Sequence, residues 1–494
     1  MNRPKKFDRN LIVIGAGAAG LVSAYISAAV KAEVTLIEAG NMGGDCLNTG
    51  CVPSKALIQC ARIAHWARRA GQFGVCVAEP EVDFPGVMRH VRASIERIAP
   101  HDSVERYTGL GVEVIQGQAR LVDPWTVTIA LNSGGERTLS ARAIVLATGA
   151  EPIVPPLPGL GKVRYLTSET LWNRCAKLDQ VPRRLLVLGG GSIGCELAQA
   201  FVRLGSDVTL VEKESRLLPR EDREVSEAIA HALTSEGVNL LTGHKALAFV
   251  GKPDRIGGAL RLRNLCNVEG ETQVTFDEVI LALGRRARTQ GFGLESLGLV
   301  QAGKLEVDAY LRTRYPHILA AGDVVGPYQF THMASHQAWY AAVNGLFGDI
   351  KKFPVDYSLI PRATFIDPEV ASVGLSEDMA SEQDIAYEVT RYDLDDLDRA
   401  IVDGAAQGFV KVLTVPDKDT ILGVSIVGEN AAELIAEFMI AMKHGLGLNK
   451  ILSTIHTYPT MVEANKFVAG NWKRAHAPKW ALRWLKLFHR WRRG

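Results

Sequence analysis

The stretch "LIVIGAGAAGLVSAYISAAVKAEVTLIE", Leu11 to Glu38, decides the fold expected for this chain. A short apolar strand runs directly into three glycines at G-x-G-x-x-G spacing, Gly15, Gly17 and Gly20. They open a helix of small residues, and a second apolar strand then ends at the acid. In a dinucleotide-binding βαβ unit, such glycines let a pyrophosphate approach the helix N-terminus, and the acid accepts a hydrogen bond from a ribose hydroxyl. The stretch therefore predicts a nucleotide site.

The same residues allow a second interpretation, because positions 11 to 30 carry no charge and are long enough for a membrane span. The glycine spacing, the second strand and the acid together favour the buried βαβ unit.

The unit recurs 174 residues later in "LLVLGGGSIGCELAQAFVRLGSDVTLVEK". Its glycines are Gly189, Gly191 and Gly194, and its second strand ends at Glu212. A duplicated fold with one inactive copy is the alternative, but both copies keep all three glycines and the acid. The repeat predicts two sites for two different dinucleotides.

Composition indicates a folded chain of about three domains, with 494 residues, 47% hydrophobic and 22% charged. Seven cysteines argue against a disulfide scaffold and indicate a reducing compartment, so we expect a cytoplasmic protein. The net charge of +2 conceals a basic tail, since residues 471–494 carry eight Lys and Arg and no acid.

Two of the cysteines lie in "GGDCLNTGCVPSK", which runs from Gly43 to Lys55. Cys46 and Cys51 do not complete a zinc pattern, so no metal site is expected. In an ideal helix they would lie about 7.5 Å apart, too far for a disulfide, so the pair is expected in a distorted first turn at Pro53. A helix N-terminus lowers the pKa of a thiol, and we interpret the pair as redox-active. The other five are expected to be buried, inert thiols.

Three further segments place small residues directly after an apolar strand. They are "AIVLATGA" (143–150), "VILALGR" (279–285) and "HILAAGDVV" (317–325). The first two are points where the chain could cross between domains. The third sets Asp323 beside Gly322, where the backbone permits close approach.

These motifs, with "PRATFIDPEVASVGLSE" (361–377), resemble those of the class I pyridine nucleotide-disulfide oxidoreductases. The resemblance covers about residues 8 to 470. The sequence of residues 101–124 is similar to that of the mercuric reductase-like and dihydrolipoamide dehydrogenase branch of the family. It implies an α/β fold with two Rossmann-like domains, for FAD and for NAD, and an α+β C-terminal dimerisation domain. The implied FAD domain comprises residues 1–152 and 278–350, the NAD(P) domain 153–277 and the interface domain 351–470.

The resemblance also implies residue roles. Cys51 is expected against the flavin as a charge-transfer thiolate, and Cys46 as the outer thiol that meets the acceptor. Lys55 is expected near the flavin, paired with Glu196, and Asp323 on the ribityl chain. The resemblance further implies a homodimer whose active sites are completed across the interface. Further cofactor contacts are expected at Gly43, Gly44, Thr148, Gly149 and Gly284.

The nicotinamide cofactor implied for the second unit is expected to be NADH, with NADPH the less favoured alternative. Glu212 can bind a ribose 2′-hydroxyl and repels a 2′-phosphate. Lys213 and Arg216 lie close enough in the sequence to weaken this preference.

Two departures from the family concern the acceptor. Asp45 precedes Cys46, where a carboxylate would raise the pKa of the thiol and repel anionic substrates. In "IHTYPTMVEAN" (455–465), thiol reductases have a histidine before the proline, but here Tyr458 stands there, while Glu463 is retained. A phenol is a poor base at neutral pH, although His456, two residues earlier, could face the same side of an extended segment.

Mercuric reductases resemble this chain in the tyrosine, but they also carry a cysteine pair near the C-terminus, and this chain has no cysteine after Cys266. The leading hypothesis is therefore an FAD-dependent NADH oxidoreductase that reduces a small acceptor: a metal ion, a sulfur species or a quinone. The alternatives are a dihydrolipoyl dehydrogenase and a slow flavin redox sensor or membrane-associated interaction protein.

The tail, residues 471–494, sets Trp480, Trp484, Leu487 and Trp491 on one face of an expected helix. A basic, Trp-rich helix is typical of contact with an anionic membrane surface. Packing on the acidic body is an equal alternative. Nucleic-acid binding is not expected, because the aromatic residues form an apolar stripe.

Overall fold

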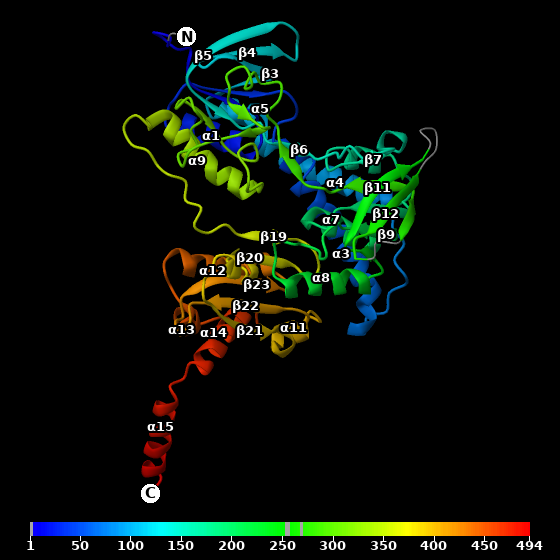
Figure 1. The fold of residues 1–494 in the computed structure, drawn as a ribbon, viewed down its shortest axis with the longest axis vertical. Helices are drawn as coiled ribbons and strands as arrows, with labels where there is room; N and C mark the ends of the chain where they lie inside the picture. Colours follow the sequence, from blue (N-terminus) through cyan, green and yellow to red (C-terminus); the bar gives the residue numbers. More distant parts are fainter. Residues whose placement is uncertain (1–2, 252–256, 267–269) are drawn as a thin grey trace.

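The computed structural model describes residues 3–251, 257–266 and 270–494. Figure 1 shows two α/β bodies, a C-terminal body below them and a terminal helix that projects away from all three. Among these residues, no helix combines the length and the apolar character needed to cross a bilayer.

The first body is built on the first βαβ unit. Its parallel strands run in the order β3-β2-β1-β5-β18, and β3 and β5 continue beyond this sheet to pair with β4 in an antiparallel meander. The apolar residues at the start of the 11–30 segment lie in β1 and are fully buried, so the βαβ prediction is confirmed and the membrane span is wrong. The strands are β1 (Arg9–Ile14), β2 (Val34–Glu38), β3 (Val112–Asp123), β4 (Thr126–Leu131), β5 (Glu136–Leu146) and β18 (Ile318–Ala320).

Helices of the first body pack on this sheet and extend toward the second body. Helix α1 packs closely on α9, because its small residues allow the two backbones to approach: the Ser23 hydroxyl donates to the Ala338 carbonyl at 3.2 Å. The helices are α1 (Ala18–Ala29), α2 (Gly44–Asn48), α3 (Cys51–Arg69), α4 (Phe84–Ile98), α5 (Val104–Gly109) and α9 (Thr331–Phe347).

The second body repeats this plan. Its five parallel strands run β10-β9-β8-β14-β7, and β11, β12 and β13 form the meander. Because β14 pairs with β8, the expected domain boundary at residue 278 is wrong: residues 278–281 belong to the second sheet. The strands are β7 (Tyr165–Leu166), β8 (Arg184–Leu188), β9 (Asp207–Val211), β10 (Asn239–Leu241), β11 (His244–Val250), β12 (Gly258–Asn264), β13 (Glu271–Phe276) and β14 (Glu278–Leu281). The helices are α6 (Leu171–Cys175), α7 (Ser192–Arg203) and α8 (Arg223–Ser235).

Two strands join these bodies at the predicted crossing points. β6 (Ala150–Pro152) follows β5, β15 (Arg285–Ala287) follows β14, and the two pair as an antiparallel ladder. A small hairpin, β16 (Val300–Gln301) and β17 (Lys304–Leu305), precedes the return of the chain to β18.

The C-terminal body is an antiparallel sheet in the order β19-β20-β23-β22-β21. Helix α12 packs on β20 and β23, and α14 on β21 and β22. The strands are β19 (Arg362–Thr364), β20 (Val370–Gly374), β21 (Glu388–Asp393), β22 (Phe409–Thr414) and β23 (Ile421–Val427). The helices are α10 (Glu377–Glu382), α11 (Asp398–Val402), α12 (Ala431–Lys443), α13 (Leu448–Ser453), α14 (Glu463–Ala475) and α15 (Lys479–Arg492).

The basic tail begins later than residue 471. Helix α14 continues to Ala475, and Trp472 is only 5% exposed within the C-terminal core, so these residues belong to the body. Helix α15 follows. It has no buried residue and projects away from the C-terminal body (Figure 1). The alternative in which the tail packs on its own body is therefore wrong for the single chain.

Candidate active site

The first glycine turn is shaped by two close backbone contacts. A Cβ added to Gly15, whose φ is +102°, would lie 2.3 Å from the carbonyl oxygen of Ala147. A Cβ on Gly20 would lie 1.7 Å from the oxygen of Gly15. At Gly17, by contrast, the nearest atom would be the Cα of Gly44, at 3.8 Å. Two glycines thus hold the turn against its neighbours, and the middle one leaves room for a ligand at the start of α1.

The second glycine turn has the same construction. A Cβ added to Gly189 would lie 2.3 Å from the Ala282 carbonyl oxygen, and one added to Gly194 would lie 1.9 Å from the Gly189 oxygen. A Cβ on Gly191 would have no atom of the described residues within 4 Å. The second copy is therefore as open to a dinucleotide as the first, which supports two working sites.

The two acids at the strand ends are held alike. The Glu38 carboxylate accepts the amides of Ala16, at 2.6 Å, and Gly40. The Glu212 carboxylate accepts the amides of Gly190, at 2.5 Å, and Glu214. Backbone donors orient each carboxylate beside its glycine turn, where a ribose would lie.

A cavity of about 1000 Å³ lies between the first glycine turn and the first turn of α7. This volume is at the upper end for small-molecule sites, about 300–1000 Å³. Of the residues expected at the site, the cavity is lined by Gly15, Gly17, Glu38, Gly44, Cys46, Cys51, Lys55, Thr148, Gly149, Glu196, Gly322 and Asp323. The expected residues that do not line it are Gly20, Gly43, Gly189, Gly191, Gly194, Glu212, Gly284, His456, Tyr458 and Glu463.

The cysteine pair belongs to two helices and not to one distorted turn. Cys46 lies in α2, and Cys51 is the first residue of α3, after a break at Thr49 and Gly50. The Gly50 amide donates to the Asp45 carbonyl at 2.6 Å, and Trp172 Nε1 donates to the Thr49 carbonyl at 2.7 Å. These bonds fold the connection back, which brings the two sulfurs together as a straight helix could not.

The two thiols are differently charged. Hydrogen bonding with Cys46 lowers the pKa of Cys51 to about 6, and the Thr331 hydroxyl, 3.5 Å away, and the Lys55 ammonium act in the same direction. The same hydrogen bond between the two sulfur atoms, together with burial, raises the pKa of Cys46. At neutral pH the reduced pair therefore holds a thiolate at position 51 and a thiol at position 46, the order that the expected roles require.

Lys55 and Glu196 form the expected ion pair. Nζ of Lys55 donates to Oε2 of Glu196 at 2.7 Å and lies 4.6 Å from the centre of the Phe365 ring. The other oxygen of Glu196, which is buried, accepts the Phe365 amide at 2.9 Å. The pair therefore sets a cation in the cavity, one helical turn beyond Cys51.

Arg285 neutralises the carboxylate that the sequence placed beside Cys46. Its Nη2 lies 2.7 Å from Oδ2 of Asp45, and its Nε lies 3.9 Å from Oδ2 of Asp323. Asp45 also accepts the Thr49 hydroxyl, so its charge is paired, and it still contributes to the raised pKa of Cys46, as expected. Burial raises the pKa of Asp323 to about 6.

Arg285 and Thr331 belong to the site but were not predicted from the sequence. Arg285 ends the quoted "VILALGR" segment, so its place next to a glycine turn was a usable indication. Thr331 begins α9, some 280 positions from Cys51, and no local pattern connects the two.

The segment that carries His456, Tyr458 and Glu463 does not line the cavity of the single chain. Tyr458 is 68% exposed, and its hydroxyl donates to Asp398 at 3.0 Å, which raises the pKa of the phenol. His456 does not share that side: its side chain is 4% exposed, with Nε2 2.9 Å from Glu437. The premise that His456 and Tyr458 face the same way is therefore wrong. Glu463 is buried at the start of α14.

The sequence predicts that the five cysteines outside the pair are buried, and this prediction is wrong for three of them. Cys175 and Cys195 are buried and Cys60 is half-buried, but Cys76 and Cys266 are exposed, because they lie in a loop and after the end of β12.

The cavity fits the FAD expected on the first unit. Among the described residues, the buried Nε of Arg285 has no hydrogen-bond acceptor, Asp323 is a half-buried carboxyl group, and the space at Gly17 is open. A polar chain that offers both donors and acceptors would satisfy the first two groups, and a pyrophosphate would fill the third position.

Comparison with known proteins agrees with this geometry. The family model described as "Pyridine nucleotide-disulphide oxidoreductase" matches residues 9–338, and the model of its dimerisation domain matches residues 360–468. A mercuric reductase of Streptomyces lividans is 36% identical, over 93% of this chain and 95% of its own length. A dihydrolipoyl dehydrogenase of Chlamydia trachomatis serovar D is 34% identical, over 92% and 94%. Among solved structures, a Cu(II) complex of the HOCl-induced flavoprotein disulfide reductase RclA from Escherichia coli is 26% identical with a TM-score of 0.81, over 95% and 99%.

Proposed function

This chain belongs to the pyridine nucleotide-disulphide oxidoreductase family, and we propose that it carries electrons from NADH through FAD to the Cys46–Cys51 pair and on to a soft metal ion. Membership makes it an FAD-dependent enzyme, so the sensor hypothesis is set aside. The match to the dimerisation domain supports a homodimer.

The observation that carries the proposal is the state of the cysteine pair in the cavity. Cys51 has a pKa of about 6 and lies near the Lys55–Glu196 pair. Bound FAD supplies a carrier that takes a hydride from a nicotinamide and passes an electron pair to a disulfide. The Lys55 ammonium favours negative charge near it, and the Glu196 carboxylate holds it in place with a hydrogen bond of 2.7 Å.

The acceptor step balances with a metal ion. Two electrons from NADH break the S–S bond and leave a Cys51 thiolate and a Cys46 thiol. Two Cu(II) ions take one electron each, or one Hg(II) takes both, while the S–S bond re-forms and one proton is released for each NADH. Thiolates are the ligands that soft metal ions prefer, so the pair can bind the ion that it reduces.

Tyr458 favours a metal ion over a disulfide as the acceptor. A disulfide substrate leaves as a thiol and needs a proton, whereas a reduced metal ion does not. The bond to Asp398 raises the pKa of the Tyr458 phenol, so near pH 7 the phenol is a still weaker acid and forms still less phenolate to act as a base. The mercuric reductase relative and the Cu(II) complex of RclA support the same class of acceptor.

Dihydrolipoyl dehydrogenase is the second candidate, because that relative is nearly as similar as the mercuric reductase. An anaerobic assay of NADH oxidation with Cu(II), Hg(II), lipoamide, glutathione disulfide and a quinone separates the candidates. Metal-dependent turnover that exceeds lipoamide turnover supports the proposal, and the reverse order supports the dehydrogenase. Preference for glutathione disulfide or for the quinone would contradict both.

The preference for NADH rests on Glu212, whose carboxylate is held by two backbone amides at the end of β9. Arg216, which could have favoured a 2′-phosphate, is paired instead with Asp378 at 2.6 Å. A higher kcat/KM with NADPH than with NADH would contradict this assignment.

Helix α15 supports a further proposal, peripheral contact with an anionic membrane. Its Trp480, Trp484 and Trp491 side chains are exposed, and no described residue of the chain covers the helix. Each basic residue near an anionic surface contributes about 1 kcal/mol, so six Lys and Arg in residues 479–494 can bind it reversibly.

A further inference from the structure

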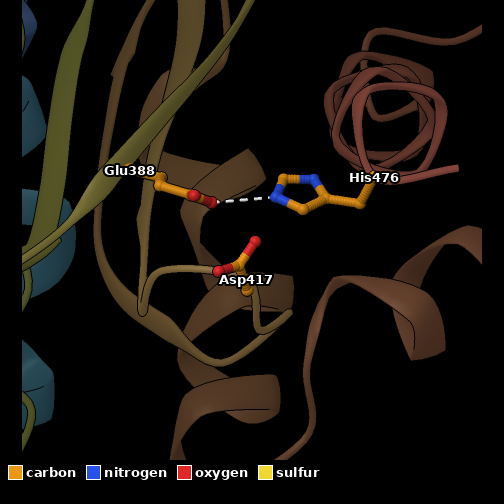
Figure 2. A group of neighbouring side chains, drawn as sticks. All are labelled: Glu388, Asp417 and His476. Atoms are coloured by element: carbon orange, nitrogen blue, oxygen red, sulfur yellow. Dashed lines mark hydrogen bonds and ion pairs between the residues drawn. The ribbon is translucent and has the colours of Figure 1, made fainter. Parts of the chain in front are cut away.

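A second group of ligand-type side chains lies on the C-terminal body, outside the redox cavity. Glu388, Asp417 and His476 each point one ligand atom at the others, and all three atoms lie within 4.8 Å of one another (Figure 2). Glu388 begins β21, Asp417 lies in the turn between β22 and β23, and His476 caps α14. Three segments that are distant along the chain therefore converge on one point.

His476 is held in a fixed orientation. Its Nδ1 lies 2.9 Å from the backbone carbonyl oxygen of Trp472, and its ring stacks on the Trp472 indole at 4.2 Å between centroids. A carbonyl oxygen only accepts, so this contact assigns the hydrogen to Nδ1 and leaves the Nε2 lone pair directed outward. Metal-binding histidines are commonly oriented by such a bond from the other ring nitrogen.

The Nε2 atom faces a carboxylate oxygen. It lies 2.9 Å from Oε2 of Glu388, so two acceptors approach each other unless a cation lies between or beside them. That cation is either a proton on the imidazole or a metal ion bound by both atoms.

The charges around the group favour a cation. Among the residues that the structure describes, Glu388 has no ion pair other than the one with His476, and Asp417 has none with any Lys or Arg. Two carboxylates therefore face one imidazole without a basic partner. Asp417 is exposed, which leaves an open path for an ion to enter.

We propose that Glu388, Asp417 and His476 bind a divalent transition-metal ion of the Zn²⁺ class. One imidazole nitrogen and two carboxylate oxygens are ligands that Zn²⁺ accepts at about 2.0–2.2 Å, which places neighbouring ligand atoms roughly 3.4 Å apart in a tetrahedron. Nε2 of His476 and Oε2 of Glu388 are 2.9 Å apart, and the Asp417 oxygen lies within 4.8 Å of both atoms. Small movements of these side chains, including that of the exposed Asp417, would bring all three separations to that value. Three protein ligands leave the fourth position to water.

This site differs from the cysteine pair in the ions that it selects. It has no sulfur, so it favours borderline ions such as Zn²⁺, whereas the thiolates favour Hg(II) and copper. It also lies at the base of α15, which begins three residues after His476. A bound ion would link β21, the β22–β23 turn and the end of α14 where the tail leaves the body.

Equilibrium dialysis of the full-length FAD-loaded homodimer against Zn²⁺ tests the proposal. The protein is first freed of metal with a chelator and kept oxidised, so that Cys46 and Cys51 are joined and cannot compete. We expect about one Zn²⁺ per chain, and at least a tenfold loss of affinity in His476→Ala and in Asp417→Asn. His489→Ala, an exposed histidine of α15, is the matched control and should bind normally.

Two results would overturn the proposal. One is unchanged Zn²⁺ binding in both variants, and the other is no stoichiometric binding by the wild-type chain, in which case a protonated His476 paired with Glu388 occupies the position. Asp417→Asn alters only a surface turn, so it keeps the test decisive even if His476→Ala disturbs folding. NADH oxidation by the same samples reports on the cysteine pair separately.

Discussion

Two regions of the chain carry the residues predicted for catalysis, the redox cavity and the 455–463 segment, and the single chain assembles them to different degrees. In the cavity, Cys46, Cys51, Lys55 and Glu196 are brought together by direct contacts between the first and second bodies. In the other region, Tyr458 is exposed and does not line the cavity. The single chain thus brings the predicted cysteine and ion pairs together, whereas a role for Tyr458 at the cysteines stays a prediction that requires a second chain.

The largest expected effect is the loss of turnover when a cysteine of the cavity is replaced. Cys51→Ser should lower NADH oxidation with any acceptor by about 10³-fold or more, because the serine cannot form the disulfide. It should also remove the long-wavelength absorbance of the two-electron-reduced protein, which requires a thiolate against the flavin. Cys46→Ser should lose turnover but keep that absorbance.

Cys76→Ser is the matched control for both variants, because Cys76 is exposed and lies outside the cavity. If the Cys46 and Cys51 variants lose the absorbance equally, the division of roles between the two sulfurs is wrong.

The second largest effect is expected from a change at Tyr458. Tyr458→His should raise lipoamide reduction at least tenfold, since general acid–base catalysis contributes about 10²–10⁴ in rate. Turnover with Cu(II) should change little, and Tyr458→Phe should leave it intact. Steady-state rates with both acceptors provide the measurement.

His456→Ala serves as the comparison variant. Because its imidazole is buried against Glu437, its loss should not alter the preference between Cu(II) and lipoamide. A steep and selective loss of lipoamide reduction would instead identify His456 as the base.

A smaller effect concerns pH. With a pKa of about 6, the Cys51 thiolate dominates at pH 7.5, and the long-wavelength absorbance should fade as the pH falls through about 6. The Lys55 cation lowers that pKa, so Lys55→Met should move the midpoint upward by on the order of one pH unit. The Glu196 carboxylate acts in the opposite direction, so Glu196→Gln should move it downward.

Spectroscopic titration of the reduced protein under anaerobic conditions measures these midpoints, and Lys162→Met, an exposed lysine outside the cavity, is the control. Identical midpoints in all four proteins would show that the Lys55–Glu196 pair does not act on Cys51.

The smallest expected effect on turnover is that of the tail. Deletion of residues 479–494 should abolish sedimentation with anionic vesicles and leave NADH oxidation unchanged, because α15 does not line the cavity and is not buried by any part of the chain that the structure describes. The deletion starts at 479 and not at 471, since Trp472 is part of the C-terminal core. Failure of the intact protein to bind such vesicles at low salt would contradict the membrane proposal.

Much of the fold could be predicted because its determinants are local. The two glycine patterns specify turns that few other residues can form, and each lies between strands whose apolar runs are read directly. The domain edge at 278 was misplaced because β14 joins the second sheet by pairing with β8, which lies far earlier in the chain, and an apolar strand does not reveal its partner. The start of the tail was misplaced for a related reason: residues 471–475 share the basic composition of the tail, but Trp472 among them is buried in the C-terminal core.

By itself, the sequence determined the type of chemistry in this protein, because that chemistry resides in residues close together along the chain: two glycine turns, their acids, and two cysteines five positions apart. Only the tertiary structure decided what surrounds them. Arg285 neutralises Asp45, Thr331 reaches Cys51, His456 is turned away from Tyr458, and Glu388, Asp417 and His476 converge. Charge and hydrogen bonding act over a few ångströms in space, and residues far apart in the sequence reach such distances only when the chain has folded.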